Sequence, residues 1–262
     1  MFSKHLEYLK FIFQGKSKYA VHSPFVHDFI ENVLDNREVY YAFLGVEHVR
    51  SSLLEQKKTI KIKDLGVGSK HSKSKNIDLK KLIKKVQSSS NKAQLLFKIV
   101  NYFSVQNTLE IGTSLGLTTA YLANANRNGK VTTIEGDPTL CEIAASNFNR
   151  LGLKNIKLIN NSFDEVLEDL FKSSYDFIFF DGNHSKEATL RYFKWAKNNM
   201  NPGSIFLFDD IYWSKGMYEA WGQICKDPDV SLSIDLFSVG MVFFHEKNQK
   251  EHFNLIHASN FY

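Results

Sequence analysis

One stretch constrains the fold of this chain more than any other, because it joins a short apolar run to an apolar helix through two glycines. The run Leu109–Ile111 carries an acid, Glu110, and Gly112 and Gly116 bracket the turn that leads into the helix. A strand that enters a helix in this way brings backbone N–H groups and the positive helix end close to a ligand. The acid is unsuited to a phosphate and suited to a cation. The stretch therefore predicts an α/β fold with a site for a sulfonium or amino-acid group.

Length and composition are those of a packed globular protein. The 262 residues suffice for one sizeable α/β domain with an extension, or for two small domains. A hydrophobic fraction of 43% and an aromatic fraction of 14% exclude a disordered chain. Cys141 and Cys225 lie far apart without a Cys-x-x-Cys pair, which argues against a disulfide framework or a zinc site and fits a reducing compartment.

The N-terminal pattern argues against export. Lys4, Glu7 and Lys10 interrupt the first apolar residues, so a signal peptide is not expected. No stretch approaches the roughly 20 apolar residues of a membrane span. We therefore expect a cytoplasmic protein without a membrane partner.

Positive charge is concentrated in one segment. The net charge is +5, and lysines crowd residues 57–92, where only Asp64 and Asp78 oppose them. Such a segment is typical of a surface that binds RNA or another polyanion. The alternative is an ordinary solvated surface, which we favour because no aromatic residues interleave with the lysines for base stacking.

The first ninety residues have the pattern of a mainly helical extension. Apolar residues at helical spacing predict an amphipathic helix over residues 3–14. These apolar residues are Phe2, Leu6, Leu9 and Phe13. Ser23 is a suitable N-cap for a second helix with Pro24 at its first position, and a third, weaker pattern covers residues 40–54. We expect residues 1–90 to cap a separate domain that spans residues 91–262.

A second glycine pair lies within this extension. Ile60 and Ile62 alternate with lysines as in a half-exposed strand, and Asp64-Leu-Gly-Val-Gly68 resembles a glycine-rich nucleotide loop. The polar residues that follow lack the apolar periodicity of a supporting helix, and a glycine pair alone is weak evidence for a site. We interpret residues 64–68 as a loop, with a second cofactor site as the less favoured alternative.

From Asn91 onward, helices and strands alternate. Asn91 with Gln94 resembles a capping box for the first helix, and Asp137 with Pro138 is expected to start the helix after the second strand. Five strand-like runs follow, each succeeded by a helical pattern: Leu109–Ile111, Lys130–Glu135, Ile156–Ile159, Tyr175–Asp181 and Ser204–Asp210. This alternation predicts a doubly wound, mostly parallel, Rossmann-like sheet. Two further runs, 232–237 and 241–245, are joined too closely to be parallel, so an antiparallel hairpin completes a seven-stranded sheet.

Residues 91–246 resemble the class I S-adenosylmethionine-dependent methyltransferases. The matching motifs, in order along the strand ends, are Glu110-Ile-Gly-Thr-Ser-Leu-Gly116, Ile134-Glu-Gly-Asp137, Phe179-Phe-Asp-Gly-Asn-His184, Pro202-Gly203 and the terminal hairpin. Within the class, Asp181-Gly-Asn-His184 and Phe208-Asp-Asp210 are similar to the small-molecule O-methyltransferases of the catechol-methyltransferase-like group.

The resemblance implies a cofactor site. Glu110 and the turn after it would hold the methionine part of S-adenosyl-L-methionine, while Glu135 would accept hydrogen bonds from both ribose hydroxyls. The residues implied in cofactor binding are Glu110, Gly112, Thr113, Ser114, Gly116, Glu135, Gly136, Ser162, Phe163 and Asp181. A nicotinamide enzyme would also place an acid at residue 135, but it would need the G-x-G-x-x-G turn that this chain lacks.

Three carboxylates suggest a metal site. Asp181, Asp209 and Asp210 follow two strands predicted to be neighbours, and close carboxylates repel one another unless a proton or a cation intervenes. Oxygen ligands without cysteine suit Mg²⁺ or another divalent cation. In the catechol-type relatives such a cation holds a substrate hydroxyl, but their third ligand is usually asparagine where Asp210 stands. The alternative is that Asp181 contacts cofactor and substrate directly while Asp209 caps the following loop.

The candidate catalytic residues are His184 and Asp181. His184 lies just before the helix opened by Ser185, where the helix dipole disfavours an imidazolium and the nearby carboxylates favour it. The catechol-type relatives have a lysine at this place. Tyr212 and Trp213 are expected to line the acceptor pocket, with core packing as the alternative.

These features predict an enzyme that transfers a methyl group from S-adenosylmethionine to a hydroxyl of a small molecule, with or without a divalent cation. One rival is an RNA ribose methyltransferase that uses the lysine-rich extension. A second rival is a non-catalytic cofactor-binding protein. The expected partner is a small-molecule acceptor, and a homodimer is left open.

Overall fold

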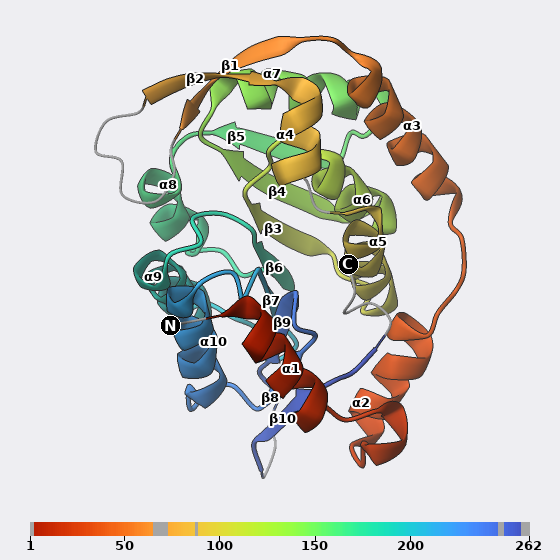
Figure 1. Ribbon diagram of the computed structural model, residues 1–262, viewed down its shortest axis with the longest axis vertical. Coiled ribbons are helices and arrows are strands. Elements are labelled where there is room, and N and C mark those ends of the chain that lie inside the picture. Colours follow the sequence, from red (N-terminus) through yellow and green to blue (C-terminus); the bar gives the residue numbers. More distant parts are fainter. Residues whose placement is uncertain (1–2, 65–72, 87–88, 246–248, 258–262) are drawn as a thin grey trace. The chain divides into compact units, whose positions relative to one another are not determined.

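The computed structural model describes residues 3–64, 73–86, 89–245 and 249–257 (Figure 1). They form two compact units, which we call the continuous unit (residues 37–166) and the discontinuous unit (residues 1–36 with 167–262). The first helices and the last strands of the chain therefore belong to the same unit. A boundary near residue 90 between an extension and a domain stays a prediction.

The continuous unit contains three parallel strands in the order β3-β4-β5. Their bounds are Asn107–Ile111, Lys130–Glu135 and Ile156–Asn160. Helices α6 (Leu117–Ala125) and α7 (Pro138–Arg150) connect them, as parallel neighbours require. The strands and helices predicted for this part of the chain are thereby confirmed. Helix α8 (Phe163–Leu170) follows β5.

The start of helix α5 (Ser90–Tyr102) differs from the prediction. Its N-cap is Ser89, whose side chain accepts a hydrogen bond from the backbone N of Lys92 at 3.2 Å. The predicted capping box of Asn91 with Gln94 is therefore wrong, because a serine two residues earlier already satisfies the first turn. At α7, by contrast, the side chain of Asp137 accepts from the backbone N of Leu140 at 2.9 Å, which confirms the predicted start at Pro138.

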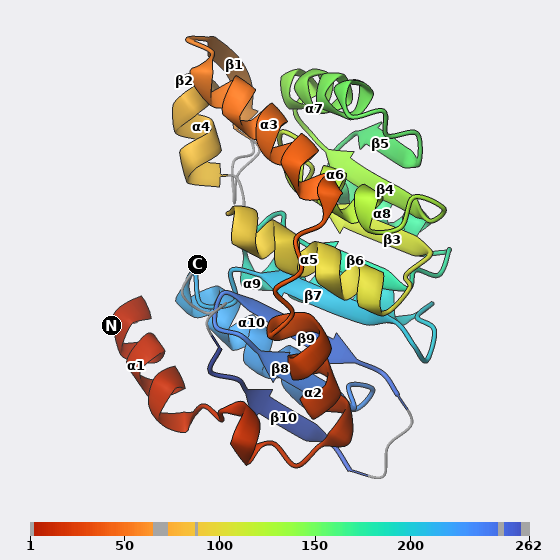
Figure 2. The same ribbon diagram turned by 90° about the vertical axis from the view of Figure 1, so that its right-hand side faces the viewer.

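A small antiparallel sheet lies in the same unit, after helix α3 (Tyr41–Glu55). It pairs β1 (Thr59–Asp64) with β2 (Lys73–Asp78), so that Ile60 lies opposite Ile77, and α4 (Leu79–Val86) follows. Figure 2 shows this hairpin with α4 and α3 beside it. The loop predicted at residues 64–68 lies, apart from Asp64, outside the described residues. The strand β2 was not predicted, because its polar sequence is strand-like only through its pairing with β1.

The discontinuous unit contains five strands in the order β10-β8-β9-β7-β6. Strands β6 (Phe177–Phe180) and β7 (Ile205–Asp209) are parallel, and helix α9 (Lys186–Lys197) connects them. After α10 (Lys215–Lys226), β8 (Leu232–Asp235) and β9 (Val239–Phe243) form the predicted antiparallel hairpin. Strand β9 pairs antiparallel with both of its neighbours, and β10–β8, β6–β7, β3–β4 and β4–β5 are parallel pairs, which confirms the mostly parallel α/β pattern.

One strand of this unit was missed in the sequence. Strand β10 (Glu251–Asn254) pairs in parallel with β8, so the described strands outside the small hairpin number eight instead of the predicted seven. Of its four residues only Phe253 is buried, and a single apolar residue gives no alternating pattern.

The N-terminal helices pack within the discontinuous unit. Their bounds are Lys4–Gln14 for α1, Pro24–Phe29 for α2 and Ile30–Leu34 for a π-helical turn, and a 3₁₀ turn covers Lys18–Ala20. Tyr8 and Phe11 of α1 place their rings 4.8 and 5.5 Å from that of Phe237. The amphipathic stripe predicted for α1 instead faces solvent, since Leu6, Leu9 and Phe13 are 56%, 53% and 86% exposed.

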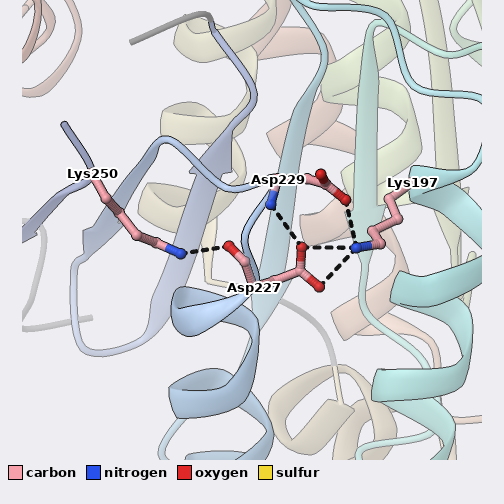
Figure 3. A network of polar contacts seen from close by, with 4 residues as sticks. All are labelled: Lys197, Asp227, Asp229 and Lys250. Carbon is pink, nitrogen blue, oxygen red and sulfur yellow. Dashed lines mark hydrogen bonds and ion pairs between the residues drawn. The ribbon is translucent and has the colours of Figure 1, made fainter. Parts of the chain in front are cut away.

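An ion-pair network fixes the end of α9 to the end of α10 (Figure 3). The ammonium of Lys197 lies 2.8 Å from each carboxylate oxygen of Asp227 and 2.6 Å from Asp229. Lys250 donates to the backbone oxygen of Asp227, which ties in the segment before β10. Among the helices described, none is long and apolar enough to cross a membrane.

Candidate active site

Glu110 is a buried acid whose two carboxylate oxygens differ in their hydrogen bonds. It lies in β3 with no exposed surface, and the hydroxyls of Thr119 and Thr133 both donate to its Oε2, at 2.5 and 2.6 Å. Its Oε1 is also buried, but no described residue offers it a hydrogen bond. Burial raises the pKa of Glu110 to about 7, although the two hydroxyls act in the opposite direction. The acid predicted to face a cation thus has one buried oxygen that no described residue engages.

The turn after β3 has the backbone that its sequence predicted. Gly112, Ser114 and Gly116 have φ angles of 109°, 50° and 76°, in the region that favours glycine. A Cβ atom on Gly116 would lie 2.5 Å from the ring of Phe148, so both conformation and space require glycine there. Thr113 points into the core, where its Oγ1 lies 2.6 Å from that of Thr133. The hydroxyl of Ser114 is buried without a hydrogen-bond partner among the described residues.

Glu135 joins this turn to the next one. Its Oε2 accepts a hydrogen bond from the backbone N of Ser114 at 2.8 Å, and its Oε1 accepts one from the backbone N of Asp137 at 2.9 Å. Burial raises the pKa of Glu135, and these hydrogen bonds act against that rise. The two turns, with Gly136 between Glu135 and Asp137, are therefore held together by one carboxylate.

The strand β5 delivers the remaining predicted cofactor residues to the same edge. The backbone N of Asn161 donates to the backbone O of Glu135 at 3.1 Å, and the side chain of Asn161 accepts from the backbone N of Ser162 at 2.8 Å. Phe163 begins α8 directly afterwards. The continuous unit thus brings Glu110, the glycine turn, Glu135 and residues 161–163 together at the carboxyl ends of three strands.

Asp181 and His184 lie in the discontinuous unit, between β6 and α9. Nε2 of His184 lies 3.7 Å from Oδ1 of Asp181, which is beyond hydrogen-bond distance, and both side chains are partly exposed. Asn183 has a φ of 53°, and the side chain of Ser185 caps α9 through the backbone N of Ala188. The predicted catalytic pair is therefore close in space and reachable by solvent.

The predicted metal ligands do not gather into a metal site. Asp209 ends the buried strand β7 and is 3% exposed, whereas the backbone of Asp210 turns into the left-handed region, with a φ of 53°. The backbone N of Asp210 donates to Ser238 O at 2.9 Å. Within the described ranges, no three His, Cys, Asp or Glu residues form a group that could hold a metal ion. Asp181, Asp209 and Asp210 therefore form no such group in the part of the chain that the structure describes.

Sequence reasoning missed one buried acid of the same unit. Asp235, at the end of β8, accepts hydrogen bonds from Tyr212 Oη at 3.0 Å, Trp221 Nε1 at 2.9 Å and the backbone N of Phe237 at 2.7 Å. Burial raises its pKa to about 6. Tyr212, two residues after Asp210, is therefore a core residue, while Trp213 is 61% exposed. The sequence feature that could have indicated Asp235 is an acid within a short apolar strand, close to aromatic residues.

The segment that holds these motifs is similar to known proteins. Residues 109–211 match the family model described as a methyltransferase domain. A catechol O-methyltransferase of Niastella koreensis is 29% identical over 128 residues, which are 47% of this chain and 57% of that protein. The chain thus spans little more than half the length of this relative.

Solved structures show the fold. An O-methyltransferase from Bacillus cereus in complex with SAH has a TM-score of 0.56 at 20% identity, covering 83% of this chain and 96% of its own. A SAH-bound methyltransferase of Podospora anserina has a TM-score of 0.60 at 14% identity, covering 86% and 97%. Family match and fold agree with the order of the strand-end motifs: residues 109–211 are similar to a methyltransferase domain, and the fold resembles that of solved methyltransferases.

Proposed function

We propose that this protein transfers a methyl group from S-adenosylmethionine to a hydroxyl of a small molecule. The observation that carries the proposal is a pair of buried polar atoms without a hydrogen-bond partner among the described residues, Glu110 Oε1 in β3 and Ser114 Oγ in the turn after it, within the segment that matches a methyltransferase domain. Leaving a buried acceptor without a partner costs about 1–3 kcal/mol. A ligand that brings hydrogen-bond donors and positive charge would remove that cost.

The residues of the continuous unit fit this cofactor. Glu110 and the turn from Gly112 to Gly116 would hold its methionine part, through the bare carboxylate oxygen, the Ser114 hydroxyl and backbone N–H groups. Glu135 would accept hydrogen bonds from the ribose hydroxyls in place of, or beside, its present backbone donors. Gly136, Ser162 and Phe163 would border the ribose and adenine.

The bound cofactor supplies a methyl group on a positively charged sulfur, which is already a strong electrophile. The protein then has to orient the acceptor and remove its proton. We assign the proton to Nε2 of His184, with Asp181 beside it at 3.7 Å. The cofactor would supply its methyl carbon to the acceptor oxygen and leave as S-adenosylhomocysteine, and His184 would hold the proton that the acceptor hydroxyl loses.

We propose that the reaction does not need a divalent cation, because Asp181, Asp209 and Asp210 do not form a three-ligand group in the described structure. Activity should then survive dialysis against EDTA. Loss of turnover that returns with added Mg²⁺ would show that the carboxylates rearrange around a metal.

The acceptor is proposed from the relatives: the catechol O-methyltransferase of Niastella koreensis suggests a phenolic hydroxyl. The cytoplasm is the proposed location, since Cys141 and Cys225 are free thiols in the structure. Whether the protein acts as a homodimer is a matter for a sedimentation measurement.

Titration calorimetry with S-adenosylmethionine tests the cofactor site. We expect wild-type binding in the micromolar range or tighter, and a loss of at least 10-fold in Glu135→Ala, which removes a charged acceptor. Asp229→Ala, an acid in the network of Figure 3, is the matched control and should bind normally. Absence of wild-type binding, or equal binding by Glu135→Ala, would refute the assignment.

Turnover assays test the base. His184→Ala should lower kcat about 100-fold or more while the affinity for the cofactor stays within twofold. A panel of catechols and other phenols serves as acceptors. Turnover by His184→Ala at the wild-type rate would show that another group takes the proton, and wild-type cofactor binding without turnover on the panel would favour a non-catalytic binding protein.

A further inference from the structure

The charge of this chain is strongly segregated. Residues 57–92 hold 12 of the 33 basic residues and 2 of the 28 acidic ones, so this segment has a formal charge of +10. The other 226 residues then carry −5, although the whole chain has a net charge of +5. An excess of this kind in 36 residues is the electrostatic footprint of a surface that meets a polyanion.

The fold turns this segment into a surface, which we call the lysine module: β1, β2 and α4 with residues 57 and 58. Four of its apolar side chains face inward, since Ile60, Leu79, Leu82 and Ile83 are 3%, 1%, 2% and 4% exposed. Its lysines with described side chains are all exposed: Lys57, Lys58, Lys61, Lys75, Lys80, Lys81 and Lys84. The positive charge is therefore presented to solvent by a framework held through its apolar face.

None of these seven lysines forms a salt bridge with any residue that the structure describes. Other lysines of the chain do form such ion pairs. In the discontinuous unit, Lys18 pairs with Asp35 at 2.9 Å and Lys186 with Glu219 at 2.5 Å, and Lys197 is held by two aspartates (Figure 3). Asp78, the one acid within the module whose side chain is described, accepts from the backbone N of Lys81 at the start of α4. The charge of the module is thus left for an external partner.

The module adjoins the candidate cofactor site. The side chain of Thr139 donates to the backbone O of Lys61 at 3.1 Å, so β1 is joined to the first turn of α7. That turn begins at Asp137, whose backbone N donates to Glu135. A partner bound to the lysines would therefore lie within a few residues of the turn that carries Glu135.

The composition of the module selects among polyanions. It contains no Phe, Tyr or Trp on which the bases of a single strand could stack, and no Arg to make bidentate contacts with base edges. The described apolar side chains of α4, Leu79, Leu82 and Ile83, are buried, so none of them is free to insert into a bilayer. Lysines alone suit the phosphate backbone of a duplex, which has one negative charge per roughly 1.7 Å of its axis.

We propose that the lysine module binds the phosphate backbone of double-stranded nucleic acid without regard to its sequence. The binding is independent of methyl transfer to a small molecule, since it uses none of the residues assigned to the cofactor or to the proton. It brings the methyltransferase domain to duplex RNA or DNA.

Fluorescence anisotropy with labelled 20-base-pair duplexes tests the proposal on the full-length protein. At 50 mM salt we expect a Kd of about 1–10 μM for duplex RNA or DNA and weaker binding to a single strand of the same length. Lys80, Lys81 and Lys84 changed together to Gln should weaken duplex binding about 10-fold or more. The slope of log K against log salt should fall by about 2 to 3 units.

The matched control changes three exposed lysines outside the module, Lys130, Lys154 and Lys194, to Gln. It removes the same formal charge and should alter duplex affinity by less than about twofold. No wild-type binding to either duplex, an equal loss in the control, or binding only to anionic phosphatidylserine vesicles would overturn the proposal. Calorimetry with S-adenosylmethionine on both triple variants, with wild-type affinity expected, confirms folding and keeps the result separate from the cofactor assignment.

Discussion

Two buried carboxylates, one in each unit, look alike until their hydrogen bonds are compared. Glu110 and Asp235 lie in or at the end of buried strands with 0% and 1% exposure, and burial raises the pKa of each, to about 7 and about 6. Three donors reach Asp235 and engage both of its oxygens. Glu110 receives two donors on one oxygen and none from described residues on the other.

The difference separates an acid whose two oxygens are both hydrogen-bonded from one with an oxygen that no described residue engages. Asp235 closes a network that links the turn after β7 to α10 and to the turn of the β8–β9 hairpin. Its cost of burial is offset by its donors. Glu110 keeps one buried oxygen that no described residue engages, in the segment that matches a methyltransferase domain. Such an acceptor costs about 1–3 kcal/mol, and a ligand with hydrogen-bond donors would remove that cost.

The largest expected effect is on stability at Asp235. Asp235→Ala leaves the Tyr212 hydroxyl, the Trp221 ring N–H and the Phe237 backbone N–H buried without their acceptor. We expect a loss of about 4 kcal/mol in the free energy of unfolding, measured by urea denaturation. Asp229→Ala, which removes an exposed partner of Lys197, should cost no more than about 1 kcal/mol. A loss at Asp235 as small as that at Asp229 would show that the network is not structural.

The second effect is a dependence of stability on pH. A buried acid with a raised pKa binds its proton more tightly in the folded chain than in the unfolded chain. The free energy of unfolding therefore falls as the pH rises from the pKa of the unfolded chain to that of the folded chain. For Glu110 that window is 4.5 to about 7, and its size is at most about 3 kcal/mol. For Asp235 the window is 3.8 to about 6.

The two acids can therefore be told apart above pH 6. In urea denaturation of the apo protein, the free energy of unfolding of the wild type should fall between pH 6 and pH 7.5. The same fall should be seen in Asp235→Asn and should be absent in Glu110→Gln. Saturating S-adenosylmethionine should flatten the fall in the wild type, because a cationic ligand stabilises ionised Glu110. A fall that persists in Glu110→Gln would assign the titration to another group.

The third effect is on cofactor affinity. Glu110→Gln keeps the shape of the side chain but loses its charge, so S-adenosylmethionine should bind about 10 to 100 times more weakly by calorimetry, a loss of about 2 kcal/mol. The apo variant should be at least as stable as the wild type at pH 8, because a charge no longer has to be buried. Asp235→Asn is the matched control, with affinity within twofold. Equal losses in both variants would remove the distinction between the two acids.

How much of this could be foreseen depends on how local the signal is. The start of α7 was predicted because Asp137 and Pro138 determine it by themselves. The start of α5 was misplaced because Ser89, Ser90 and Asn91 are all suitable caps, and only the folded backbone selects among them. Strand β10 could not be foreseen, since Glu251–Asn254 becomes a strand by pairing with β8.

The candidate site divides in the same way. The turn from Gly112 to Gly116 and its acid were predicted because a strand, two glycines and a helix follow one another in the sequence. The missing hydrogen bond at Oε1 of Glu110 was not predicted, because the positions of the Thr119 and Thr133 hydroxyls in the fold decide which carboxylate oxygen accepts a hydrogen bond. Asp235 escaped notice since its side-chain donors, Tyr212 and Trp221, lie 23 and 14 residues away.

The smallest expected effect is the loss of stability when one of the three donors to Asp235 is removed. Tyr212→Phe removes one hydroxyl and leaves Trp221 and the Phe237 backbone N–H in place, and the ring can keep its stacking on Phe237, where the centroids are 4.5 Å apart. Because the lost bond joins a hydroxyl to a carboxylate that retains two donors, we expect a loss of about 1 to 2 kcal/mol in urea denaturation. The affinity for S-adenosylmethionine should not change. A loss as large as that of Asp235→Ala would mean that Tyr212 alone holds the carboxylate, and that the network is less redundant than its three donors indicate.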